Sequence, residues 1–278
     1  MTENRQINGI SIVLPVINEC LNLEILIPEL LRVCDDLGIQ SEIIVADDGS
    51  DDGTSQFIES YNSSDSRVRI IDRSGRLRSL PESINDGVLN SNFEYVLWMD
   101  ADGSMPPLVL NDLVASFETY GLRGETIVVG SRFVKGGGFK GSDGSGKTRL
   151  LQAHRNLQTT NDSFVAMILS RILNRYLWIM LGRCCKDPAS GFVLARRTFL
   201  LSNRLIGSYG DYCPRLLFTA KKQGVQIIEV PYICLPRQFG VSKTGITLRQ
   251  LIKRGLPYVT LPFRIRLKSK RAKTNIAF

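Results

Sequence analysis

Short apolar runs alternate with longer segments of helical periodicity along the first half of the chain. The apolar runs have the length and residue types of buried strands, and they lie at Ile10–Pro15, Glu42–Ala46, Val68–Asp72, Tyr95–Met99 and Thr126–Ser131. Between them, apolar residues recur three and four positions apart, which predicts helices at Leu21–Leu37, from near Thr54, at Leu80–Leu89 and at Leu108–Tyr120. This alternation predicts an α/β fold with a Rossmann-like, mostly parallel sheet flanked by helices.

Polar side chains follow three of the predicted strands at the points where the strands end. The strand ends lie at Pro15, Asp47 and Asp100, and Glu19 and Asp48 follow the first two. The carboxyl ends of parallel strands meet at one edge of a sheet, where open α/β proteins bind their ligands. We therefore expect these side chains to gather in one site.

The two carboxylates that leave the fourth strand are the main candidates for chemistry. Asp100 and Asp102 are one residue apart and follow an apolar run directly. Two like charges this close raise the pKa of one carboxylate unless a cation lies between them. Mg²⁺ or Mn²⁺, with a diphosphate completing the coordination, would satisfy both. A solvated, Asp-rich turn is the alternative.

The second strand runs into a turn rich in aspartate and glycine, at Asp47–Thr54. Its glycines permit a tight turn and a close approach of the backbone to a ligand. Asp48 is placed to accept hydrogen bonds from a ribose or a base. The same turn also has the residues to cap the helix that begins near Thr54, and the two roles are compatible.

Positive charge is concentrated at the C-terminal end of the chain. The formal net charge is +8, yet the residues from Arg237 to Phe278 contain eleven Lys/Arg and no acidic residue. Within this segment an apolar stretch, Gly255–Phe263, is interrupted by Pro257 and Pro262, and six basic residues follow in 264–273. The stretch is too short to span a bilayer but suits a membrane interface, where each Lys/Arg contributes about 1 kcal/mol. A nucleic-acid-binding arm is the alternative, although no aromatic residues interleave the basic run.

A further apolar segment and the single histidine narrow the function classes. Phe164–Leu181 is interrupted by Arg171, Asn174 and Arg175, which indicates an amphipathic helix, packed on the domain or lying on a bilayer surface, and not a transmembrane span. His154 alone argues against a His-rich zinc site or a Ser-His-Asp triad. The six cysteines show no C-x-x-C spacing and are expected to be reduced thiols, and the N-terminus predicts no secretory signal.

Five motifs follow one another along the chain, at Ile12–Glu19, Asp47–Thr54, Asp100–Asp102, Gly130–Phe133 and Asp187–Phe192. In order and spacing they resemble the motifs of family 2 glycosyltransferases with the GT-A fold. Within that family, Val230-Pro231 followed by Arg237 and by Gly240–Lys243 is most similar to the polyprenol-phosphate, or dolichol-phosphate, mannosyltransferases. The resemblance covers the chain from about Ile10 to Gly245.

The resemblance implies a role for each of these residues. It implies that residues 1–236 form the catalytic domain, and that 237–278 supply a phosphate-contacting loop and a basic amphipathic segment at the membrane interface. The metal, Mg²⁺ or Mn²⁺, would be held by Asp100 and Asp102. The donor would be bound by Pro15, Glu19, Asp48 and Asp100. The catalytic residues would be Asp100, Asp102, Arg132 and, in a sugar-positioning or structural role, Asp187. The phosphates of donor and acceptor would meet Arg132, Arg237, Ser242 and Lys243.

The implied reaction is an inverting, metal-dependent transfer of a sugar from a nucleotide-sugar to a polyprenyl phosphate. GDP-mannose is the first candidate donor and UDP-glucose the second. The attacking phosphate oxygen is already an anion, so no strong general base is needed, which suits a chain with one histidine. The resemblance further implies a peripheral enzyme at an anionic membrane surface on the cytoplasmic side, with a small membrane-protein partner in some relatives.

Two other functions stay open. An enzyme that glycosylates a hydroxyl group of a glycan or lipid would need a general base, and Asp187 is available for it. A non-catalytic protein that binds nucleotides or nucleic acid would use the same sheet edge, but the basic run favours a lipid surface, and no nucleic-acid partner is expected. Gly136–Lys147 is rich in glycine and is either a loop that closes over the site or a solvated insertion. Arg149 and Arg155 are equal candidates for contact with the lipid phosphate.

Overall fold

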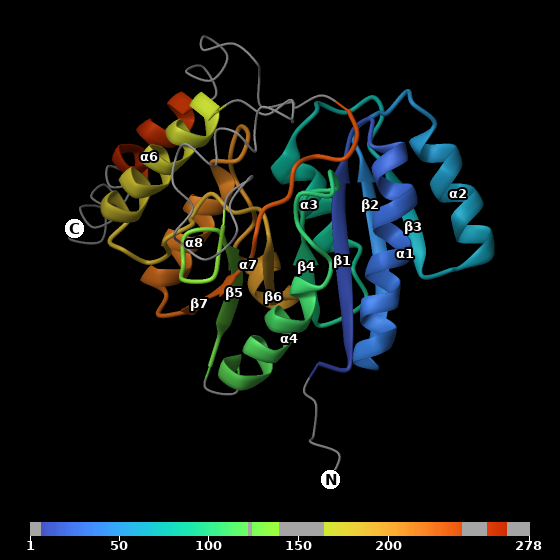
Figure 1. Ribbon diagram of the computed structural model, residues 1–278, viewed down its shortest axis with the longest axis horizontal. Coiled ribbons are helices and arrows are strands. Elements are labelled where there is room, and N and C mark those ends of the chain that lie inside the picture. Colours follow the sequence, from blue (N-terminus) through green and yellow to red (C-terminus); the bar gives the residue numbers. More distant parts are fainter. Residues whose placement is uncertain (1–6, 122–123, 139–163, 241–254, 266–278) are drawn as a thin grey trace, which may run out of the picture.

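A computed structural model describes residues 7–121, 124–138, 164–240 and 255–265 of the 278-residue chain. These residues form a central sheet of seven strands with helices on both faces (Figure 1). The strands follow the order β3-β2-β1-β4-β6-β5-β7 across the sheet. Their bounds are Gly9–Val16 (β1), Gln40–Asp47 (β2), Val68–Asp72 (β3), Tyr95–Trp98 (β4), Thr126–Ser131 (β5), Val193–Arg196 (β6) and Gln226–Pro231 (β7).

The sheet is parallel except at one strand. β1 pairs in parallel with β2 and β4, β2 with β3, and β5 with β7. β6 runs antiparallel to both of its neighbours, β4 and β5. The expected mostly parallel sheet is therefore confirmed, with one reversed strand that the sequence pattern did not predict.

Alternate residues of the strands build two apolar cores, one on each face of the sheet. Ile12 and Val13 of β1 are both fully buried but belong to different cores. One core is covered by α1 (Cys20–Leu37), α2 (Thr54–Ser64) and α4 (Val109–Tyr120). The other is covered by α3 (Leu80–Leu89), α7 (Arg197–Ser202) and α8 (Tyr212–Lys222). Cover on both faces explains why the central strands read as continuous apolar runs.

Two further helices pack on each other at one side of the molecule. The helix α6 spans Phe164–Met180, and a second helix spans residues 255–265 (yellow and red in Figure 1). The hydroxyl of Tyr176 donates a hydrogen bond to the carbonyl of Val259 at 2.8 Å, which joins the two. Across the described part of the chain, no helix is both long enough and apolar enough to cross a membrane.

Most of the expected strands and helices form, with bounds that agree within two residues. Gly255–Phe263 lies in a continuous helix in spite of its two prolines. Pro257 falls in the first turn of that helix, where its missing N–H costs no hydrogen bond within the helix. The helix expected from Ile246, and most of Gly136–Lys147, lie outside the described residues.

Candidate active site

The carboxyl ends of β1, β2 and β4 meet at one edge of the sheet. Val16 pairs with Asp47, and Val13 pairs with Trp98, so the segments that follow these strands lie side by side (Figure 1). Pro15, near the end of β1, is partly exposed there. The expected convergence of strand ends at one edge is therefore confirmed by the fold.

Asp100 and Asp102 lie on the turn that follows β4. The Asp102 carboxylate accepts a hydrogen bond from the N–H of Ser104 at 3.0 Å, and Gly103 adopts a positive φ of 75° that permits the turn. Burial, and next the charge of Asp102, raise the pKa of Asp100 to about 7. The charges of Arg132 and Arg237 lower this pKa, but by less than burial and Asp102 raise it. The positive charge that the protein supplies therefore compensates Asp100 only in part.

The guanidinium of Arg237 connects Asp102 with Glu19. It lies 3.1 Å from an Asp102 oxygen, and 2.9 and 3.0 Å from the two Glu19 oxygens. Glu19 also accepts a hydrogen bond from the side-chain amide of Asn22 at 2.6 Å. The guanidinium is thus held between two carboxylates beside the D-x-D turn, and one of them, Glu19, is 218 positions away from Arg237 in the sequence.

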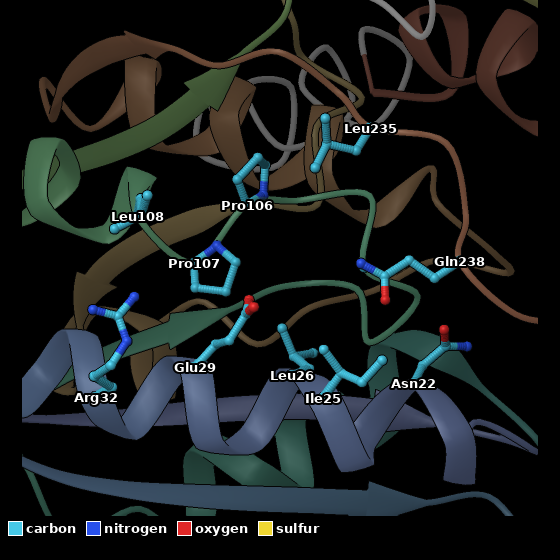
Figure 2. A pocket seen from close by; sticks show the side chains of 11 residues that line it. Asn22, Ile25, Leu26, Glu29, Arg32, Pro106, Pro107, Leu108, Leu235 and Gln238 are labelled. Carbon is cyan, nitrogen blue, oxygen red and sulfur yellow. The ribbon is translucent and has the colours of Figure 1, made fainter.

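The segment that carries Arg237 rests on α1 and on the loop after β4. The N–H of Leu235 donates to the carbonyl of Ser104, and the main chain of Phe239 exchanges hydrogen bonds with the side chain of Asn22. A pocket of about 210 Å³ lies between these parts, as Figure 2 shows. Its apolar lining consists of Ile25, Leu26, Pro106, Pro107, Leu108 and Leu235. These contacts hold the segment that carries Arg237 against α1 and the loop after β4.

Asp48 is fixed by two neighbours at the edge of the site. Its oxygens accept hydrogen bonds from Nε of Arg73 at 2.7 Å and from the N–H of Ser79 at 3.0 Å. Arg73 is almost fully buried and also pairs with Asp86 of α3. Each Asp48 oxygen retains a lone pair for a ligand. Sequence reasoning missed Arg73, and the available signal was its place directly after the predicted strand Val68–Asp72.

Arg132 and Asp187 form a buried, bidentate ion pair. Nε and Nη2 of Arg132 each lie 2.7 Å from an Asp187 oxygen, and the Arg132 N–H donates a third hydrogen bond at 2.9 Å. The Asp187 side chain is fully buried, and its N–H donates to Glu229. Burial lowers the pKa of Arg132, but the charge of Asp187 outweighs it and raises that pKa well above its usual value. The pair ties the end of β5 to the loop before β6.

The loop that contains Asp187 also packs against the acidic turn. A Cβ added to Gly191 would lie 3.5 Å from Oδ1 of Asp100 and 3.5 Å from the hydroxyl of Tyr212. Four of the candidate phosphate contacts lie outside the described residues: Ser242, Lys243, Arg149 and Arg155. Of the remaining candidates, Arg237 contacts Asp102 of the D-x-D turn, and the charge of Arg132 acts on Asp100.

The D-x-D turn fits a divalent cation that a ligand helps to hold. In the part of the chain that the structure describes, no cluster of three or more His, Cys, Asp or Glu side chains is suited to a metal. Mg²⁺ is commonly bound by one or two carboxylates together with substrate phosphates, and Asp100 and Asp102 supply that number. A cation beside Asp100 would also offset the repulsion that raises its pKa.

Comparisons with known proteins agree with this arrangement. The model of glycosyl transferase family 2 matches residues 11–178. The chain is 28% identical over 247 residues to polyprenol monophosphomannose synthase of Mycolicibacterium smegmatis, which covers 86% of this chain and 82% of that protein. It is also 28% identical over 234 residues to dolichol-phosphate mannosyltransferase of Pyrococcus furiosus, which covers 84% of this chain but 58% of that relative.

Solved structures share the fold at lower identity. Mannosyl-3-phosphoglycerate synthase from Rubrobacter xylanophilus superposes with a TM-score of 0.64 at 17% identity, covering 95% of this chain and 75% of that one. Glucosyl-3-phosphoglycerate synthase from Mycobacterium tuberculosis, in complex with Mn²⁺ and UDP-glucose, gives a TM-score of 0.59 at 19% identity, covering 91% and 77%. Both support a GT-A-like sheet flanked by helices.

Proposed function

The chain belongs to glycosyl transferase family 2, and on that basis we propose that it transfers mannose from a nucleotide-sugar to a polyprenyl phosphate. The sugar and the acceptor are supported by the names of the two curated relatives, which both act on polyprenol-type lipids and mannose. GDP-mannose is the proposed donor. UDP-glucose is the second candidate, since one structural neighbour binds it.

The observation that carries this proposal is the contact between Arg237 and the acidic turn. Transfer between two phosphates gathers several negative charges in one place, so the site needs cations more than it needs a base. Asp100 and Asp102 would hold Mg²⁺ or Mn²⁺, which would neutralise the leaving diphosphate. Arg237, already 3.1 Å from Asp102, is placed to contact the same phosphates.

The reaction requires a simple exchange of bonds at the sugar. A phosphate oxygen of the acceptor attacks C1 of the mannose, a new C1–O bond forms, and the C1–O bond to the nucleoside diphosphate breaks with inversion. The attacking oxygen is an anion, so no proton has to be removed. Arg237, together with Lys243 and Ser242, would bring the two phosphates together. Arg132 would add positive charge from behind the site.

The nucleoside half of the donor would occupy the edge formed by β1 and β2. Asp48 is held by Arg73 and Ser79 with lone pairs left over, which suits hydrogen bonds to a ribose or base. Pro15 would contact the base, and Glu19 would act on the donor through Arg237. Asp187, with both oxygens on Arg132, is better suited to maintaining the site than to removing a proton.

We further propose two functional parts and a peripheral membrane location. Residues 1–236 would form the catalytic domain, and 237–278 would supply the phosphate-contacting loop and a basic segment that binds an anionic membrane on its cytoplasmic side. The eleven Lys/Arg without any acidic residue in 237–278 support this assignment. A small membrane-protein partner would fit the same surface, and no nucleic-acid partner is proposed.

Transfer of radiolabel into an organic-extractable polyprenyl phosphate tests the proposal. GDP-mannose and UDP-glucose are supplied separately, each with Mn²⁺ and with EDTA. We expect labelled lipid from GDP-mannose, its loss with EDTA, and a decrease of at least about 100-fold for Asp102→Ala. Asp36→Ala, a highly exposed position on α1, serves as the matched control and should behave as the wild type.

The other outcomes of this assay are informative as well. Labelling from UDP-glucose alone would keep the reaction class and change the sugar. Consumption of the donor only when a hydroxyl acceptor is present would move the assignment to a glycan or glycolipid transferase. Activity that persists in EDTA and in Asp102→Ala would contradict the metal role of the D-x-D turn.

A further inference from the structure

Two packed helices, α6 and the helix over residues 255–265, each expose a stripe of apolar side chains. Their exposed fractions lie between 37 and 61%. The spacing of three, four and seven residues places each set on one face of its helix, while Leu177 and Leu261 on the opposite faces are fully buried. We call the six exposed residues the two-helix face: Leu169, Ile172 and Ile179 of α6, with Leu256, Val259 and Phe263 of the second helix.

The two stripes are continuous with each other. Tyr176 lies on the same side of α6 as Ile172 and Ile179, four residues after the first and three before the second. Its hydroxyl donates a hydrogen bond to the carbonyl of Val259, which belongs to the stripe of the second helix. The helices also lie next to each other at one end of the molecule in Figure 1. Together they present one apolar surface.

Positive charge borders this surface and negative charge is absent from its helices. Arg171 and Arg175 are exposed on α6, and Arg264 is exposed near the end of the second helix. Neither 164–180 nor 255–265 contains an Asp or a Glu. An apolar stripe flanked by arginines is typical of helices that lie in the plane of a membrane interface.

An aromatic side chain reinforces the same pattern. The guanidinium of Arg175 lies over the indole of Trp178, 4.4 Å from the ring centroid. The guanidinium of Arg183 lies over the same ring, 5.3 Å from its centroid. Tryptophan and arginine combine an apolar body with a polar group, and both are favoured where hydrocarbon meets headgroups. A partner protein would have to meet this positive rim with acidic groups of its own, whereas anionic lipid supplies them without any specific fit.

We propose that the two-helix face docks on an anionic lipid bilayer and so brings the sheet edge to its lipid substrate. The inference rests on the proposed function and deepens it, since it assigns a described surface to membrane contact in addition to the basic run in 264–273. The inner side of the second helix packs against the segment before α8, where the hydroxyl of Tyr258 lies beside Gly210.

Vesicle sedimentation of the full chain tests the proposal. The joint replacement Ile172→Ser, Ile179→Ser and Val259→Ser should lower partition onto phosphatidylcholine vesicles with about 30% phosphatidylglycerol by roughly tenfold or more. The matched control carries serine at three exposed apolar positions elsewhere, Leu89, Leu201 and Ile206. We expect the control to partition as the wild type does.

Tryptophan fluorescence gives a readout of the contact itself. The chain has two tryptophans, and Trp98 is only 1% exposed in the core, so quenching by lipid would report on Trp178, which lies on α6 beside the two-helix face. Vesicles with brominated acyl chains should quench the emission of Trp178 on binding. In Trp178→Phe the remaining emission should stay unquenched.

Three results would overturn the proposal: equal partition of the face variant and the control, no quenching of Trp178 on bound vesicles, or a wild-type dimer that the face variant dissociates. A short-chain polyprenyl phosphate dissolved in buffer separates this inference from the proposed function. The face variant and the control should both glycosylate this soluble acceptor at the wild-type rate, because no membrane is involved. Absence of transfer together with normal vesicle binding would count against the proposed reaction and leave the docking surface intact.

Discussion

Charge balance at single residues explains why the site needs a ligand. Burial and the charge of Asp102 raise the pKa of Asp100 to about 7, while the guanidinium of Arg237 forms ion pairs with Asp102 and Glu19. Burying an incompletely compensated carboxylate costs stability, which is acceptable where the charge serves a function. The acidic turn is therefore a place where folding and ligand binding make opposing demands.

The substitution Asp100→Asn separates these two demands. Asparagine has almost the same shape without the charge, so the metal-free protein should be as stable as the wild type or more stable, by about 1–3 kcal/mol. Differential scanning fluorimetry with and without Mn²⁺ should show a rise in Tm on metal addition for the wild type and none for the variant. If Asp100→Asn is less stable than the wild type and its Tm still rises with Mn²⁺, Asp100 neither destabilises the metal-free protein nor binds the metal.

For Asp187→Asn we expect the opposite effect on stability. Asp187→Asn breaks a buried ion pair in which three hydrogen bonds join Arg132 to one carboxylate, so urea unfolding should show a loss of about 3–5 kcal/mol. Asp36→Asn breaks an exposed pair with Arg32 and should change stability by less than about 0.5 kcal/mol. Loss of transfer in Asp187→Asn without any loss of stability would restore Asp187 as a catalytic base.

At the level of strands and helices, local pattern explained half of the fold. The apolar runs and the helical spacing gave nearly all elements up to Ser131, because four of those five strands are buried on both sides and the edge strand β3 is partly buried. The sequence pattern did not predict the strand Val193–Arg196, because it is four residues long and pairs antiparallel with strands far away in sequence. The same limit applies to the site: Arg73 and the contact of Arg237 with Glu19 depend on long-range packing that no local motif reports.

The packing of α3 on β1 gives a test at this level. A Cβ on Gly87 would lie 2.3 Å from a methyl group of the buried Val13, so the helix and the strand are closer than any side chain allows. Gly87→Ala should destabilise the protein by about 1–3 kcal/mol, although alanine favours helix by about 1 kcal/mol. Chemical denaturation measures the change, and Glu59→Ala on the exposed side of α2 is the near-neutral control. A stabilised Gly87→Ala would mean that the two elements separate easily.

In the whole molecule, charge is divided between a nearly neutral body and a basic C-terminal segment. The stretch 237–278 carries eleven Lys/Arg, so most of the attraction to an anionic surface acts at one end of the chain. The two-helix face and the basic run adjoin in sequence, since the second helix ends at residue 265 and the run continues to 273. Apolar burial and charge attraction would then act on the same membrane, with different responses to salt.

Removal of residues 266–278 tests this division of roles. The deletion takes away five Lys/Arg, each worth about 1 kcal/mol near an anionic surface, so vesicle partition should fall by about 100-fold or more at low salt. High salt screens the charges and should bring the wild type close to the deletion variant, which keeps the apolar contact. A version with 266–278 in scrambled order should bind as the wild type, because the effect depends on charge and not on sequence. Preference of the wild type for duplex DNA over vesicles at physiological salt would instead support a nucleic-acid-binding arm, and would remove the main physical argument for a lipid surface.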